Sequence, residues 1–264
     1  MCLTTPVLII LWFAASIAAV TTSKITVSSV GPLQLCTVQF LAAALIERIQ
    51  LAWVQHCIRP LAREAQLVKR VALTYTLGFA FTNIAFSLAN ASLVETVKAG
   101  EPISTVLLAA MMLGEVERVP TYISLVPIVL GVALASSGDA TFNLPSSAST
   151  FAANICFSSR TVLTKKMKNA HPGCPCATSE TCLFYHVSKL GLLLLLLPAL
   201  SLQSMAWLLV DGQLANQAAA ATPANAMPLV MFLCFNATMY TMYNQMSWMV
   251  LSRVSSATHA VLNM

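Results

Sequence analysis

Long stretches of apolar residues, each almost free of charge, alternate with short polar breaks along the chain. Eight of them approach the roughly 20 residues that a helix needs to cross a bilayer. They cover residues 3–23, 28–46, 71–90, 92–114, 120–138, 147–166, 183–201 and 227–250. Residues 255–264 are too few for a crossing and predict the start of a ninth helix. The pattern predicts an all-α membrane protein.

Composition agrees with a membrane protein and excludes other classes. Of the 264 residues, 58% are hydrophobic and 9% are charged, whereas a soluble domain carries about 25% charged residues. The net charge of +5 does not indicate nucleic acid as a partner, because the basic residues are not gathered on a soluble domain. The sequence shows no catalytic constellation, so we expect neither an enzyme nor a cofactor.

Basic residues are distributed unevenly between the two sides of the predicted bundle. Ten lie in or beside the loops of one side, and one, Lys24, lies on the other. The ten are Arg48, Arg59, Arg63, Lys69, Arg70, Arg118, Lys165, Lys166, Lys168 and Arg253. This bias predicts a cytosolic N-terminus. No basic residue precedes the first apolar stretch, so we expect no signal peptide, and no Ser- and Arg-rich transit peptide either.

The eight cysteines do not follow a familiar metal-binding pattern. Four of them lie in or beside apolar stretches, where cysteine acts as a small hydrophobe. These are Cys36, Cys156, Cys182 and Cys234. Cys174 and Cys176 form a C-x-C pair without a second pair, which is a poor zinc or redox motif. The sequence therefore predicts no metal site.

Lys98 is the residue most indicative of function. Uncharged residues run from Val71 to Val94 before it and from Pro102 to Gly114 after it. An ammonium group inside a membrane is costly and usually faces a wet cavity or an anion. Lys98 is therefore expected to bind a negatively charged solute. The alternative is a structural lysine paired with an acid one helical turn away, Glu95 or Glu101.

Several motifs surround this lysine. Residues 96–102 (TVKAGEP), 124–136 (SLVPIVLGVALAS) and 154–166 (NICFSSRTVLTKK) are the longest, and residues 243–245 (YNQ) and 258–261 (THAV) are shorter. They resemble, in this order, T-[IV]-K-A-x-E-P, S-L-x-P-[IV]-x-x-G-V-x-[LM]-A-S, N-x-x-F-x-x-R-x-[IV]-x-[ST]-K-K, Y-N-Q and T-H-x-V of the triose-phosphate/phosphate translocator family. This family belongs to the drug/metabolite transporter superfamily.

The resemblance implies a helical bundle of two inverted repeats, with ten spans in the family and about eight plus a partial ninth in this chain. Residues 1–264 would form one transmembrane transporter domain, incomplete at its C-terminus. Its first half would cover 3–138 and its second half 147–264. The Lys-Arg pair that clamps phosphate from the family's ninth helix would follow a few residues beyond Met264.

The resemblance also implies a membrane antiporter that exchanges a phosphorylated sugar or related organic phosphate for inorganic phosphate. Its membrane would be the plastid envelope, or that of the Golgi or ER. One alternative is a nucleotide-sugar/nucleotide antiporter of the Golgi or ER. Another, of a different class, is an inactive truncated membrane protein. The expected partners are a small anionic metabolite and the lipid bilayer, and the sequence leaves a homodimer open.

Four residues form the predicted substrate site. By resemblance, Lys98 is the substrate lysine, and Thr82 and Tyr243 are hydroxyl residues of the phosphate site. The chain departs from the family at Phe79 and Glu95, where the family has histidines. We expect Glu95 to pair with Lys98 and to weaken an incoming dianion by repulsion. In the alternative, Glu95 faces another helix and never meets the substrate.

Other polar residues in the spans have plainer interpretations. Arg160, Lys165 and Lys166 are expected to anchor a cytosolic helix end. Alternatively, they attract anions to a cytosolic mouth. Tyr243 could also be an interfacial aromatic residue. His186 and His259 are expected to pack and to form hydrogen bonds rather than to bind ligands.

Overall fold

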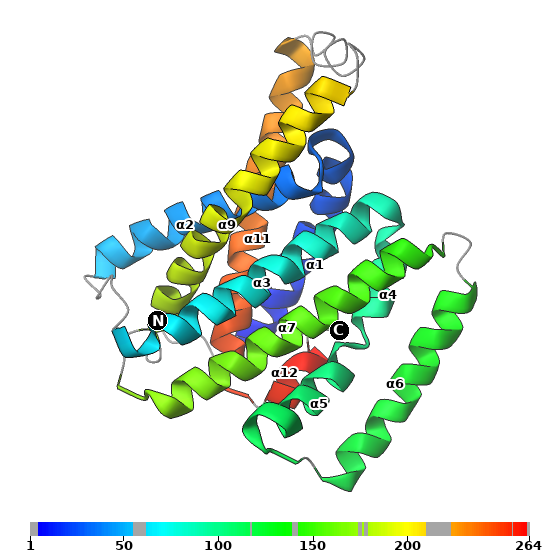
Figure 1. Ribbon diagram of the computed structural model, residues 1–264, viewed down its shortest axis with the longest axis vertical. Helices are drawn as coiled ribbons and strands as arrows, with labels where there is room; N and C mark the ends of the chain where they lie inside the picture. Colours follow the sequence, from blue (N-terminus) through cyan, green and yellow to red (C-terminus); the bar gives the residue numbers. More distant parts are fainter. Residues whose placement is uncertain are drawn as a thin grey trace.

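The computed structural model describes residues 5–54, 62–116, 118–138, 142–173, 176, 179–209, 223–254 and 256–262. Every regular element in these ranges is a helix, which confirms the predicted all-α fold (Figure 1). The helices are α1 (Thr5–Val30), α2 (Pro32–Val54), α3 (Ala62–Leu88), α4 (Ala91–Lys98), α5 (Glu101–Leu113), α6 (Val119–Gly138), α7 (Leu144–Ala170), α9 (Glu180–Leu209), α11 (Pro223–Leu251) and α12 (Ser256–Leu262).

Six segments among the described residues are long and apolar enough to cross a membrane. They are Thr5–Val30, Pro32–Trp53, Glu64–Leu88, Ala91–Leu113, Val119–Gly138 and Glu180–Ser201. The two other expected spans are also long helices, α7 and α11, but they are not among the six. Helix α7 contains many Ser, Thr and Asn residues and several basic residues, which lower its hydropathy.

The predicted boundary after the first span is wrong. Helix α1 continues to Val30, so Lys24 lies inside the helix and not in a loop. Its Nζ donates hydrogen bonds to the carbonyl oxygens of Phe86 (2.6 Å) and Ala89 (2.7 Å), at the end of α3. A helix end leaves such carbonyls without partners in its own ladder, and a basic side chain can satisfy them. Lys24 therefore ties α1 to the end of α3.

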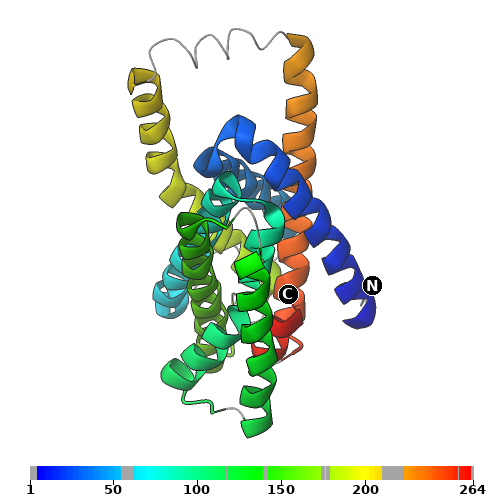
Figure 2. The same ribbon diagram turned by 90° about the vertical axis from the view of Figure 1, so that its right-hand side faces the viewer.

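Helices from the two predicted halves pack in pairs: α3 against α7, α1 against α11, and α2 against α9 (Figures 1 and 2). In span order these are pairs 3–6, 1–8 and 2–7. An inverted repeat of five helices would exchange 1 with 6, 2 with 7 and 3 with 8. This exchange converts pair 3–6 into pair 8–1 and leaves pair 2–7 unchanged. The pairing is thus of the kind that the repeat predicts, while the division into halves remains a prediction.

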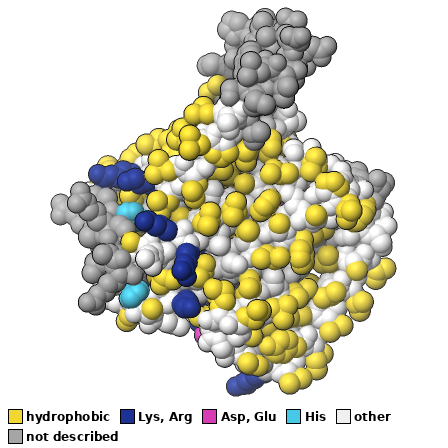
Figure 3. All heavy atoms as spheres, in the orientation of Figure 1, with side chains coloured by type: hydrophobic (Ala, Val, Ile, Leu, Met, Phe, Trp, Pro, Cys, Tyr) yellow, Lys and Arg dark blue, Asp and Glu magenta, His cyan; other side chains and the backbone are white. Residues whose placement is uncertain are grey.

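Aromatic rings fill the centre of the bundle, where α2, α3, α7, α9 and α11 meet. Tyr75 is fully buried and packs edge-to-face against Phe40, Phe79 and Phe184, with ring centroids 4.9–6.2 Å apart. The face drawn in Figure 3 carries many apolar side chains, and most of the basic side chains in view lie toward its left side, with one more at the lower end. Such a face suits contact with lipid tails along the bundle and with water where the basic side chains lie.

Candidate functional site

The predicted fourth span, 92–114, is broken beside Lys98. Helix α4 ends at Lys98 and α5 begins at Glu101. In a continuous helix the carbonyl of Lys98 would accept the N–H of the residue four positions later, which is Pro102 and has no N–H. Gly100 instead takes the position before α5, and its own N–H donates to the carbonyl of Val97 (3.1 Å). The break thus follows from the local sequence.

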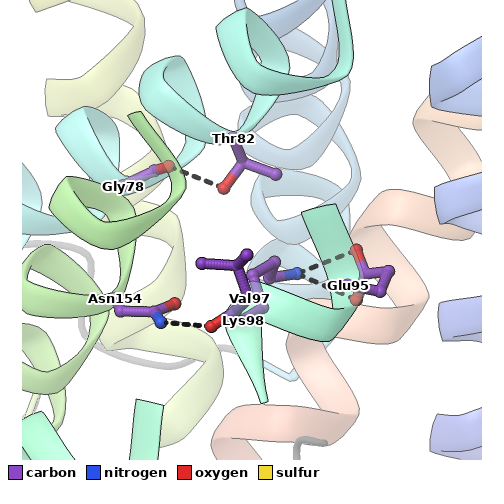
Figure 4. Close-up of polar contacts among 6 residues, drawn as sticks. All are labelled: Gly78, Thr82, Glu95, Val97, Lys98 and Asn154. Carbon is purple, nitrogen blue, oxygen red and sulfur yellow. Dashed lines mark hydrogen bonds and ion pairs between the residues drawn. The ribbon is translucent and has the colours of Figure 1, made fainter. Parts of the chain in front are cut away.

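Helix α7 supplies the side chains that satisfy this break. The Asn154 amide donates from Nδ2 to the carbonyl of Val97 (2.9 Å), and Figure 4 shows this contact beside Lys98. One turn further along α7, the Ser158 hydroxyl donates to the carbonyl of Glu101 (3.3 Å). The two helix ends that flank Lys98 are therefore held by one neighbouring helix.

Lys98 forms an ion pair with Glu95, as one of the alternatives from the sequence predicted. Its Nζ lies 3.2 Å and 3.4 Å from the two carboxylate oxygens of Glu95, one turn earlier on α4 (Figure 4). The Lys98 side chain is 13% exposed and that of Glu95 is 35% exposed. The lysine is thus the buried member of the pair.

Lys98 also lines an internal cavity. The described residues around it are Ala19, Val20, Ser23, Gln39, Phe79, Thr82, Asn83, Phe86, Lys98, Phe157, Arg160, Tyr240, Tyr243 and Asn244. They come from six helices, namely α1, α2, α3, α4, α7 and α11. The structure thus brings together three of the four predicted site residues, Lys98, Thr82 and Tyr243. Glu95 is not in this lining.

The Thr82 hydroxyl has an internal partner in this conformation. Thr82 is buried, at 4% exposure, and its Oγ1 donates to the carbonyl of Gly78 (2.9 Å) on the same helix (Figure 4). Its oxygen still offers lone pairs, but its proton is engaged. Thr82 would have to release Gly78 before it could donate to a bound anion.

Glu95 lines a second hollow on the outer side of α4. The other residues of that hollow come mainly from α1, and Leu262 of α12 completes it. Glu95 thus contacts Lys98 from outside the cavity. The expected ion pair of Glu95 with Lys98 is confirmed, while its expected effect on an incoming anion stays a prediction.

Arg160 does not lie at an exposed helix end, as the sequence suggested. It is 4% exposed and belongs to the lining of the Lys98 cavity. The guanidinium carbon lies 4.9 Å from the ring centre of Trp248, 5.7 Å from that of Tyr75 and 5.8 Å from that of Phe157. These are cation–π distances. The aromatic centre of the bundle therefore also contains a buried cation.

The other two basic residues of this group behave differently from Arg160. Lys165 forms an ion pair with Glu115, and Lys166 is exposed at the end of α7. Both are thus placed where a helix-end anchor would be. Lys165 follows Arg160 by five positions of helix, which is enough to move from the buried section of α7 toward its end.

A chain of buried amides reaches the cavity through Gln39 and Asn83, and the sequence analysis missed it. The amide of Gln39 donates to Oδ1 of Asn236 (2.9 Å) and accepts from Nδ2 of Asn83 (3.3 Å). Asn236 donates in turn to the hydroxyls of Thr22 (2.8 Å) and Ser23 (2.9 Å). These residues are all buried. Their signal in the sequence was available: large amides within otherwise apolar stretches, which in lipid seek partners on other helices.

His259 is confirmed as a packing and hydrogen-bonding residue. It is fully buried, its Nε2 lies 3.1 Å from the Ser247 hydroxyl, and its ring stacks on Trp12 with centroids 5.2 Å apart. His186 lies elsewhere, near the start of α9. Neither histidine lines the Lys98 cavity.

An all-helical bundle with apolar outer faces and a cation-lined internal cavity defines the class of polytopic membrane transporters. The model of the Triose-phosphate Transporter family matches residues 3–264, and the chain belongs to this family. The family resemblance expected from the motifs around Lys98 is thereby confirmed.

Three relatives illustrate the relationship. The chain is 33% identical over 235 residues to phosphoenolpyruvate/phosphate translocator 1 of Oryza sativa subsp. japonica, which covers 88% of the chain and 55% of the relative. It is 32% identical over 236 residues to the protein of the same name from Arabidopsis thaliana, with coverage of 88% and 55%. It is also 32% identical over 236 residues to the triose phosphate/phosphate translocator, non-green plastid, of Brassica oleracea var. botrytis, with coverage of 88% and 56%. The chain thus spans about half the length of these relatives.

Proposed function

We propose that this chain forms the transport unit, or most of it, of a membrane antiporter that exchanges a phosphorylated small metabolite for inorganic phosphate. Membership of a transporter family supports transport rather than catalysis. The names of the relatives, which pair phosphoenolpyruvate or triose phosphate with phosphate, support this substrate class. Those relatives are named as chloroplastic or plastid proteins, so we also propose the plastid envelope as the membrane.

One observation carries the proposal: two cations, Lys98 and Arg160, line the same internal cavity. Among the ion pairs of the described residues, Lys98 has Glu95 as partner, but Arg160 takes part in none. A buried charge without a counter-charge is costly. A phosphate group that bound between the two cations would remove this cost and would accept hydrogen bonds from the guanidinium.

Charge also gives a physical reason for exchange rather than one-way transport. With the cavity empty, movement of the helices would carry an uncompensated cation through the low-dielectric interior. With an anion bound, the same movement carries a neutralised site. The loaded carrier is thus expected to change its open side more readily than the empty one. Each half-cycle then needs a phosphate or a phosphorylated metabolite.

The size of the cavity indicates how the cycle would proceed. The cavity has a volume of about 30 Å³, and roughly 10–15 Å³ is needed for each water molecule. The cavity therefore has room for about two waters and not for a sugar phosphate. A substrate would need the surrounding helices to separate. The break between α4 and α5 lets the segment that carries Lys98 move without the rest of the span.

Exchange in liposomes tests this function. A full-length version of the protein is reconstituted with or without internal phosphate, and the uptake of labelled phosphate, phosphoenolpyruvate and triose phosphate is measured. We expect uptake that depends on internal phosphate, and a fall to the liposome background for Lys98→Ala. Lys166→Ala, which removes an exposed lysine outside the cavity, is the control and should keep the wild-type rate.

Two results would contradict the proposal. Wild-type rates in Lys98→Ala would remove the lysine from the transport site. Exchange of nucleotide sugars for nucleotides, with no exchange of phosphate, would favour the alternative antiporter instead.

A further inference from the structure

A second cluster of reactive side chains lies outside the cavity, where α9 begins. Cys182 and His186 are four residues apart on α9, so they share one face of the helix. Cys176 approaches them from the segment that precedes α9. All three are buried, with exposures of 0% for Cys176, 1% for Cys182 and 8% for His186. The transport function proposed above uses none of them.

The geometry of this trio matches that of a tetrahedral metal site. The two sulfurs and a ring nitrogen of His186 all lie within 4.8 Å of one another. The sulfurs of Cys176 and Cys182 are 3.7 Å apart. Zinc–sulfur bonds of about 2.3 Å at a tetrahedral angle place two sulfurs about 3.8 Å apart. The cysteines are thus already spaced as ligands of one ion, and are well beyond the roughly 2.05 Å of a disulfide bond.

One ring nitrogen of His186, Nε2, is buried and has no hydrogen-bond partner among the described residues. A buried polar atom of this kind costs free energy unless something binds it. A metal ion at the centre of the trio would bind one ring nitrogen. The other nitrogen would then remain for an outer partner, as is usual for histidine ligands.

Glu64, at the start of α3, orients the trio. It is fully buried, and its Oε1 accepts the backbone N–H of Cys176 at 3.4 Å. Glu64 does not belong to the group of three residues whose ligand atoms lie within 4.8 Å of one another. It is therefore a positioning residue, which holds the segment with Cys176 against α3. The cluster thus joins α3, from the first predicted half, to α9, from the second.

We propose that Cys176, Cys182 and His186 bind a thiophilic metal ion of the zinc class and clip α3 to α9. Two thiolates and a neutral imidazole around Zn²⁺ give a site with no net charge, which suits a buried position in a membrane protein. Binding displaces the proton of each thiol, and both protons leave to the solvent. A water molecule would take the fourth position.

This ion was not predicted from the sequence, and the reason is specific. The sequence drew attention to the neighbouring C-x-C pair, of which Cys174 lies outside the described residues. The trio instead has spacings of six and four residues, and only folding against α3 brings Cys176 back over the first turns of α9. The segment is also predicted to be cytosolic, where thiols stay reduced and can act as ligands.

Metal content of the full-length protein tests the proposal. The protein is purified in detergent with a phosphine reductant, loaded with Zn²⁺, desalted and analysed by mass spectrometry for metals. We expect one zinc per chain, and less than about a tenth of this in Cys176→Ser, Cys182→Ser and His186→Asn. Cys234→Ser, which replaces an exposed cysteine on α11, is the matched control and should keep the ion.

Cobalt provides a second readout that does not require any variant to fold. Co²⁺ titrated into the wild-type protein should produce a thiolate-to-cobalt charge-transfer band and the visible bands of tetrahedral cobalt, and Zn²⁺ should erase both. Glu64→Gln should keep the tetrahedral bands but weaken binding, because it acts through Cys176.

Three results would overturn the metal site. The wild-type protein could bind no zinc and show two thiols fewer when it is not reduced, which would mean a disulfide. The zinc could persist in Cys176→Ser, which would place it elsewhere. It could also be lost from Cys234→Ser as readily as from the others, which would mean loose binding to any thiol. None of these readouts depends on transport, so the proposed function is tested separately.

Discussion

Lys98 and Arg160 line the same cavity, but their surroundings differ. Lys98 sits at the end of a broken helix, keeps 13% of its side chain exposed and has a carboxylate within 3.2 Å. Arg160 sits in the buried section of an unbroken helix and is 4% exposed. It is surrounded by aromatic rings and takes part in none of the ion pairs found among the described residues.

The difference assigns different parts to the two cations. Lys98 has a flexible side chain and lies at a break in its span. Its charge can therefore change position when a substrate binds. A guanidinium stacked on Trp248 is held in one place and presents a planar set of donors. If the proposed phosphate site exists, we infer that Arg160 is its fixed element and Lys98 its movable one. The predictions below test this contrast.

The largest effect is expected at Arg160. Arg160→Met keeps an apolar side chain of similar length against the rings but removes the charge. Phosphate exchange should fall by roughly 10- to 100-fold, the equivalent of about 1.5–3 kcal/mol for a hydrogen bond to a charged group. Arg160→Lys should also lose most of the exchange, because an ammonium group does not present the planar fork. Initial rates in phosphate-loaded liposomes measure both.

Arg118→Ala is the control for this prediction, since Arg118 is an exposed arginine between α5 and α6. It should leave exchange unchanged. Size-exclusion profiles of all three variants distinguish a lost site from a lost fold. If Arg160→Met is folded and exchanges phosphate normally, Arg160 has no part in the site and the contrast between the two cations is wrong.

A smaller effect, of opposite sign, is expected at Glu95. Its carboxylate competes with an incoming anion for Lys98, so Glu95→Gln or Glu95→His should lower the phosphate half-saturation concentration. A partly exposed ion pair contributes up to about 1 kcal/mol, so the decrease should be about two- to fivefold. The concentration dependence of phosphate uptake gives this value.

Glu115→Gln is the matched control, because it breaks the ion pair with Lys165 at the end of α7. It should leave the half-saturation concentration unchanged. Unchanged or higher values in both Glu95 variants would show that the pair does not regulate access to Lys98.

The smallest effect is expected at Asn154, which binds the carbonyl of Val97 at the helix break. Asn154→Ala should lower the free energy of unfolding by about 1 kcal/mol, the typical net value of one hydrogen bond. For a chain of this size that corresponds to a decrease of roughly 2–4 °C in the unfolding temperature. Thermal unfolding in detergent, followed by tryptophan fluorescence, checks this value. Asn169→Ala, at the exposed end of α7, should not change it, and an equal decrease there would argue against a special role of the break.

Much of the fold could be predicted because lipid constrains sequence strongly. A span has to be apolar and of fixed length, so the apolar stretches located most of the helices. The interruption of the 92–114 span between Lys98 and Glu101 was not predicted. The same reasoning failed at Lys24. A single basic residue looked like the end of a span, whereas the structure satisfies its charge with the carbonyls of Phe86 and Ala89 and continues the helix.

The candidate site was predicted in part, for a related reason. Lys98 stood out because it is the one basic residue in its predicted span, 92–114, with long uncharged stretches on both sides of the Glu95–Glu101 segment. Arg160 could not be recognised in this way, because it is followed closely by Lys165 and Lys166 and resembled the first residue of a helix-end cluster. The partners of a buried charge lie on other helices. The residues near Arg160 in the sequence therefore do not indicate that it packs against Trp248 and Tyr75.

The sequence by itself determined the all-helical class, the positions of most helices and the family, and it singled out Lys98 as a candidate site residue. These properties depend on local composition and spacing, which the bilayer constrains directly in each span. Only the tertiary structure decided that Arg160 shares the cavity with Lys98, that Glu95 touches the lysine from outside, and that Cys176 meets Cys182 and His186. Each of these depends on which helix faces are brought together, and packing between distant segments sets that arrangement.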